Sequence, residues 1–100
     1  MNQEIANNLS TFKNHIEDYD RGYRDLVRDF EAVTSHMKAL NGMWTGEAHD
    51  ALMQRFERDR NTTQDMIDYM KQILDDLRFA NTEYTKCENT VAGIVDSIRV

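Results

Sequence analysis

Apolar side chains recur at alternating steps of four and three residues along the whole first half of the chain. A spacing of 3.5 residues places such side chains on one face of a helix that crosses a neighbouring helix at a shallow angle. The first half is therefore predicted to form one long amphipathic helix over about residues 3–41. The positions of this stripe, all apolar or aromatic, are Ile5, Leu9, Phe12, Ile16, Tyr19, Tyr23, Leu26, Phe30, Val33, Met37 and Leu40.

The second half of the chain repeats the same pattern, and a second helix is predicted over about residues 47–97. Only Asp59 and Thr63 depart from its stripe. Cys87 lies on the stripe, so we expect it to be a buried, inert thiol. The stripe positions are Leu52, Phe56, Asp59, Thr63, Met66, Met70, Ile73, Leu77, Ala80, Tyr84, Cys87, Val91, Ile94 and Ile98.

One break separates the two stripes, and a turn is predicted over residues 42–46. Gly42 is expected to end the first helix in the left-handed conformation, and Thr45 is expected to cap the second helix. Each arm would be roughly 55 to 75 Å long at 1.5 Å per residue, so the two arms must lie antiparallel to bury their stripes. The predicted fold is an all-α helical hairpin, one domain over residues 1–100.

Further apolar residues widen the face of the second helix. Ile67 and Leu74 lie beside the stripe, and together with it they make a face that one partner helix cannot cover. Two hairpins packed as a four-helix bundle would cover it, most simply as a homodimer. A monomer with scattered exposed apolar residues is the alternative. The predicted core and dimer residues are Phe30, Val33, Met37, Leu40, Phe56, Met66, Ile67, Met70, Ile73, Leu74 and Leu77.

Asp59 interrupts the second stripe at a position that antiparallel pairing places near Arg28. A partly buried contact between these two side chains would fix the register of the helices at some cost in stability. The alternative is that the helices splay here and water solvates both groups.

Composition excludes several classes of function. The chain has 18 acidic and 12 basic residues, a net charge of -6, and so no electrostatic footprint for nucleic acid. Its one Cys excludes an internal disulfide framework, and its three His form no metal-ligand spacing. A phosphate loop and a nucleophile motif are both missing from the sequence, so we expect no enzyme activity, cofactor or metal. Neither a Sec-type signal nor a membrane span is expected.

Two short motifs remain after these exclusions. Trp44 and Gly46 form a Trp-x-Gly element in the turn, and Tyr84 and Glu88 form a Tyr-x-x-x-Glu element late in the second helix. Taken singly, the first is explained as a hydrophobic clip over the helix ends and the second as a common helical pair. Both motifs, two amphipathic helices and a length of 100 residues together resemble the WXG family of small type VII secretion substrates, also called the early secreted antigenic target family. The resemblance spans the whole chain.

This resemblance implies antiparallel dimerisation, with itself or with a WXG paralogue, and secretion without a cleaved Sec signal by a machine that an FtsK/SpoIIIE-type ATPase drives. It links Trp44 and Gly46 to fold and secretion, and it makes Tyr84 and Glu88 the signal that the machine recognises. Two other roles stay open: an adaptor for a larger toxin, and a membrane-active effector. The acidic balance of the chain disfavours the membrane role.

Overall fold

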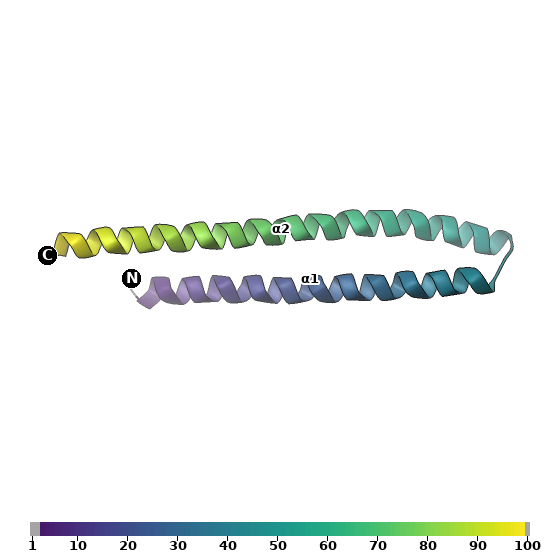
Figure 1. Cartoon of the computed structure of the whole chain (residues 1–100), viewed down its shortest axis with the longest axis horizontal. Coiled ribbons are helices and arrows are strands. Elements are labelled where there is room, and N and C mark those ends of the chain that lie inside the picture. The colour runs from purple at the N-terminus through teal and green to yellow at the C-terminus, as the bar shows by residue number, and fades with distance from the viewer. Residues whose placement is uncertain (1–2, 100) are drawn as a thin grey trace. The chain divides into compact units, whose positions relative to one another are not determined.

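The computed structural model describes residues 3–99, which form two helices, α1 (Gln3–Met43) and α2 (Glu47–Arg99). The two helices run antiparallel and are joined by three residues (Figure 1). The predicted all-α helical hairpin is confirmed. Each helix ends about two residues later than predicted, at Met43 and at Arg99.

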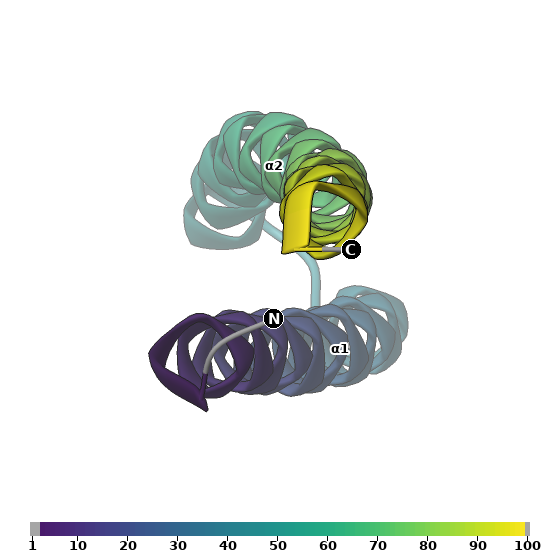
Figure 2. The same cartoon turned by 90° about the vertical axis from the view of Figure 1, so that its left-hand side faces the viewer.

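Contacts divide the chain into two compact units. The turn unit, Gly22–Lys71, holds the end of α1, the turn and the start of α2. The terminal unit joins Met1–Arg21 to Gln72–Val100 and is described here over residues 3–21 and 72–99. In each unit one segment of α1 pairs with one segment of α2, and Figure 2 shows no further layer over either helix. Within the described residues, each helix therefore has a neighbour on one side only.

The turn differs from the expected one at both of its predicted end points. Gly42 stays inside α1, and Gly46 takes the positive backbone angle, with a φ of 121°. The amide of Asp50 donates to the carbonyl oxygen of Gly46 at 3.0 Å, so Gly46 caps α2 in place of Thr45. The chain reverses within three residues, which requires a backbone conformation that glycine adopts without a steric penalty.

The stripe of α1 faces α2 for most of its length. Ile16 is buried, and the other stripe residues are partly exposed except Val33 and Leu40, which are exposed. This distribution fits a single neighbouring helix, because one helix covers the centre of an apolar face and leaves its edge open. The partly exposed members are Ile5, Leu9, Phe12, Tyr19, Tyr23, Leu26, Phe30 and Met37.

The seam of α2 keeps Phe56, Thr63, Met70 and Leu77 of the predicted stripe, but between them and after Leu77 it lies one residue further along. Ile67 in the turn unit and Leu74 in the terminal unit are 4% and 7% exposed, whereas Met66 is 47% exposed. The predicted stripe is therefore wrong at these shifted positions. We define the seam row of α2 as the residues with reduced exposure that repeat at steps of three and four: Met53, Phe56, Arg60, Thr63, Ile67, Met70, Leu74, Leu77, Asn81, Thr85, Glu88 and Ala92.

Asp59 explains part of this shift. A seam centred on the predicted stripe would bury the Asp59 carboxylate, which is costly without a partner. The observed seam instead leaves Asp59 70% exposed, 3.9 Å from Arg55, while Arg28 pairs with Asp25 and Asp29. Of the two alternatives, the contact between Asp59 and Arg28 is therefore not formed, and both groups are open to solvent.

The same shift changes the position of Cys87. Its thiol is exposed, so the prediction of a buried cysteine is wrong. The seam row passes through Thr85 and Glu88 here, and Cys87 lies beside that row on the side away from α1. The apolar stripe of this segment consequently faces outward.

Candidate functional site

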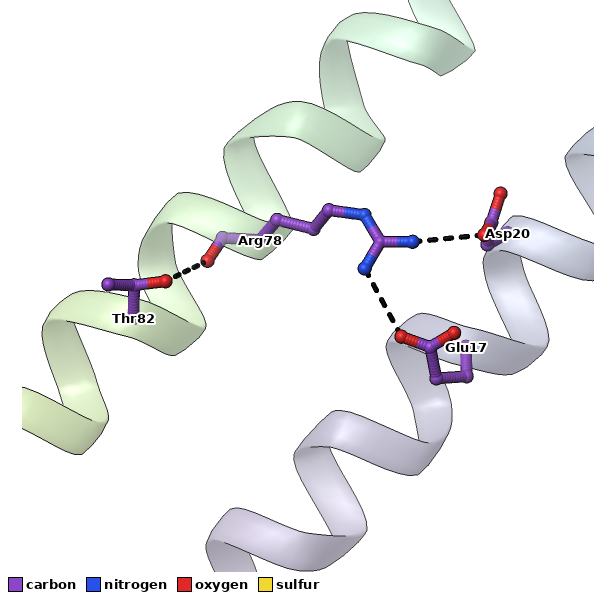
Figure 3. A network of polar contacts seen from close by, with 4 residues as sticks. All are labelled: Glu17, Asp20, Arg78 and Thr82. Atoms are coloured by element: carbon purple, nitrogen blue, oxygen red, sulfur yellow. Dashed lines mark hydrogen bonds and ion pairs between the residues drawn. The ribbon is translucent and has the colours of Figure 1, made fainter.

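A polar network joins the two helices of the terminal unit (Figure 3). Arg78 extends from α2 and donates from Nη2 to Oδ2 of Asp20 at 2.9 Å and from Nη1 to Oε1 of Glu17 at 3.1 Å. The Asp20 side chain is 9% exposed. Thr82 donates from Oγ1 to the Arg78 carbonyl oxygen at 3.1 Å, one turn further along α2.

This network has a structural role, because a buried carboxylate is costly unless a cation and hydrogen bonds compensate it. A shift of one helix against the other would separate Arg78 from Asp20, so the network favours one register. The sequence analysis missed it. The available signal was that Asp20 follows Ile16 by four residues, which places a carboxylate on the buried side of the α1 stripe.

The terminal unit exposes an apolar surface on α2. The residues that face α1 after Leu77 are mostly polar, namely Asn81, Thr85 and Glu88, followed by Ala92. We call the exposed apolar residues from Tyr84 onward, together with the exposed Cys87, the terminal apolar surface, and nothing in the described chain covers them. They are Tyr84, Cys87, Val91, Ile94, Val95 and Ile98.

Tyr84 and Glu88 lie one helical turn apart in this unit. Tyr84 is 39% exposed and belongs to the terminal apolar surface, whereas Glu88 is partly buried on the seam row. Tyr84 is therefore the more exposed residue of the pair. The aromatic part of the motif is accessible on the folded helix.

The turn unit has two different sides. On one side a groove of about 270 Å³ is lined by Leu26, Val33 and Phe56, with Asp29 and Asp59 at its edges. Val33, Leu40, Leu52 and Met66 are exposed apolar residues of this unit, and we call them the turn apolar surface. On the other side a groove of about 590 Å³ is lined by both kinds of residue, by the apolar Val27, Phe30 and Ile67 and by the polar Glu31, Lys38 and Gln64. Met43 and Tyr69 are also exposed in this unit, at 81% and 63%.

The predicted core and dimer residues divide into three groups. Ile67 and Leu74 are buried, and Val33, Leu40 and Met66 are exposed on the turn apolar surface. The remaining residues are partly exposed along the seam: Phe30, Met37, Phe56, Met70, Ile73 and Leu77.

The Trp-x-Gly turn brings an aromatic pair together. The Trp44 ring meets the His49 ring edge to face, with centroids 5.3 Å apart and an interplanar angle of 83°. Trp44 is 40% exposed, so it covers the start of α2 and also faces solvent. Gly46 supplies the backbone conformation that lets the chain turn beneath this pair.

Neither a metal centre nor a membrane-spanning segment is found in the part of the chain that the structure describes. No three His, Cys, Asp or Glu side chains of residues 3–99 gather closely enough to hold a metal ion. Neither described helix has a stretch apolar enough to cross a membrane.

Comparison of the chain with protein-family models, with curated proteins and with solved structures gave no match.

Proposed function

We propose that this chain is a small, non-enzymatic substrate of a type VII-like secretion system, and that it works as a four-helix dimer of hairpins. The observation that carries the proposal is that α1 leaves the terminal and turn apolar surfaces uncovered. The exposed apolar residues of these surfaces repeat at heptad spacing. A second pair of amphipathic helices would bury residues with that spacing. The WXG-like motifs support the secretion role by resemblance.

Dimerisation has a direct test in the mass of the protein in solution. Light scattering at micromolar concentration should give twice 11.8 kDa for the wild-type chain. Met66→Glu places a charge on the turn apolar surface and should shift the mass toward the monomer. Gln64→Glu adds the same charge at an exposed position of α2 outside the turn apolar surface and serves as the matched control. A wild-type mass near that of one chain would contradict the dimer.

The proposed secretion signal is Tyr84 with Glu88, because residues four apart share one face of a helix. Glu88→Ala should abolish release from the producing cell while leaving the circular-dichroism melt nearly unchanged. Glu83→Ala removes an exposed carboxylate outside the motif and is the matched control. Release should also require the secretion ATPase. Normal release of the Glu88→Ala chain would contradict the assignment.

Tyr84→Ala is a weaker test of the signal, because it also removes apolar area from the proposed dimer contact. The adaptor role would show itself differently: the chain purified from its native cell would carry a larger protein in equal amount. Recovery of the self-dimer alone supports the substrate role.

A further inference from the structure

Asn41 is followed by Gly42, and this is the one Asn-Gly pair in the sequence. An asparagine side chain carries an amide whose carbon can be attacked by the backbone nitrogen of the next residue. Glycine has no Cβ atom to obstruct this approach, and it adopts unusual backbone angles readily. The other asparagines all precede a residue with a side chain, namely Asn2, Asn7, Asn8, Asn14, Asn61, Asn81 and Asn89.

The structure places this pair in an exposed, uncapped turn at the end of α1. Gly42 is the residue before the last one of that helix, and a Cβ atom there would meet open space. Within residues 3–99, the one backbone hydrogen bond outside the helices runs from Asp50 to Gly46. No amide of the turn therefore caps the last carbonyl oxygens of α1. Such a helix end opens more readily than the helix centre.

We propose that Asn41 is a site of spontaneous deamidation, and that opening of the last turn of α1 controls its rate. The backbone nitrogen of Gly42 gives up its proton and forms a bond to Cγ of Asn41, and the side-chain nitrogen leaves as ammonia. Water then opens the resulting succinimide ring and leaves aspartate or isoaspartate at this position. Water is the co-reactant. This role does not depend on the secretion proposal.

Two constraints oppose the reaction while the turn is closed. The amide of Gly42 belongs to α1, so its nitrogen is not free to attack until the last turn opens. The side chain of Asn41 is also held, because its Oδ1 lies 2.6 Å from Nε2 of His49 on α2. This contact restrains the amide whichever of the two side chains donates the hydrogen bond. Closure of the turn should therefore slow the reaction.

Conversion of Asn41 would change the charge and the backbone of the turn. A new carboxylate would lie at the negative end of the α1 dipole, and the last turn of α1 has no basic residue. It would also add to the acidic residues Glu47 and Asp50 in the first turn of α2. Isoaspartate would in addition insert a methylene group into the backbone and interrupt the last turn of α1. The converted chain should consequently unfold at a lower urea concentration.

The test incubates the whole chain in mildly alkaline buffer and follows each asparagine by peptide mass spectrometry. An enzymatic assay for isoaspartate gives a second readout. Asn41 should convert before the other asparagines, and Gly42→Ala should slow it to their rate. Gly93→Ala is the matched control, because Gly93 is also helical but follows an alanine, and it should leave the rate unchanged.

Two comparisons test the control by the end of α1. Conversion of Asn41 should be faster in urea than in buffer, because unfolding releases both constraints. His49→Ala should speed conversion in buffer, whereas His36→Ala removes an exposed histidine of α1 and should not. Conversion of Asn41 no faster than that of the other asparagines, or an unchanged rate in Gly42→Ala, would overturn the site. Equal rates in buffer and urea, or a His49→Ala rate no higher than wild type, would overturn the control by the turn.

Discussion

The turn unit and the terminal unit use the same apolar period but hold their helices together in different ways. In the terminal unit, Ile16 and Leu74 are buried and Arg78 bridges to the buried Asp20. In the turn unit, Ile67 is the buried apolar residue, and Arg60 occupies the seam row between grooves on both sides. The two units therefore differ in the polar residue set into the seam: Arg78 is paired with a buried carboxylate, whereas Arg60 lies between two grooves.

The largest expected effect comes from truncating the buried residue of each unit. Leu74→Ala should lower the free energy of unfolding by about 3 kcal/mol, because it removes buried apolar contacts and leaves a cavity. Ile67→Ala should cost less, about 2 kcal/mol, since water from the adjacent groove can fill the space. Urea unfolding of both variants measures the difference. A larger loss for Ile67→Ala would reverse our ranking of the two units.

The next effect tests the ion pair that joins the two helices of the terminal unit. Arg78→Met should cost about 2 kcal/mol, because it leaves the buried Asp20 without this cation while Arg78 itself is half exposed. Arg21→Met is the matched control: it breaks the exposed pair with Asp18 and should cost under about 0.5 kcal/mol.

A double variant separates pairing from packing in the same network. Asp20→Leu combined with Arg78→Met should recover most of the stability lost in Arg78→Met, because no buried carboxylate then remains. If the double variant is no more stable than Arg78→Met, the arginine acts by packing and not by charge.

A third comparison concerns the two glycines near the turn. Gly46→Ala should cost about 1 to 2 kcal/mol, because its φ of 121° is strained for any residue with a Cβ atom. Gly42→Ala should instead stabilise the chain by about 0.5 to 1 kcal/mol, since Gly42 is helical and has open space where a Cβ would lie. Equal effects at the two positions, read from thermal melts, would contradict the observed turn.

Sequence periodicity predicted the fold correctly because it follows from helix geometry alone. Two stripes at a spacing of 3.5 residues, separated by one glycine-rich break, leave few alternatives to a helical hairpin. The stripe of α1 was also predicted correctly, since that helix has a single apolar row with Ile16 near its centre.

Periodicity failed where two adjacent rows were both apolar. On α2, Met66 and Ile67 are neighbours in sequence, and the pattern cannot tell which of them faces α1. In the structure Ile67 is buried and Met66 is exposed. The same register leaves Asp59 exposed to solvent. Periodicity also could not predict that Arg78 pairs with Asp20. The two residues lie on different helices and meet only when the helices pack.

The candidate site was predictable only as short motifs. The spacing of Tyr84 and Glu88 placed them on one helical face, but which of the two is more exposed depends on the register of α2. The contacts of His49 depend on the geometry of the turn. The sequence analysis did not predict that geometry, because it assigned the left-handed conformation to Gly42 and not to Gly46.

The smallest effect tests why the turn unit packs less tightly. Arg60 lies on the seam row, and within the described chain its buried Nε has no hydrogen-bond partner, although Nη2 donates to Glu57 at 2.6 Å. Arg60→Leu removes the uncompensated donor and adds apolar area, so it should stabilise the chain by about 1 kcal/mol.

Arg58→Leu is the control for this gain, because Arg58 is exposed and its loss changes the net charge equally. Urea unfolding of the two variants compares them at the same charge. A gain for Arg60→Leu alone would mean that one seam cation accounts for the difference between the units. A loss would mean that the aliphatic stem of Arg60 already packs in the seam as well as leucine does, and that the grooves beside it have another cause.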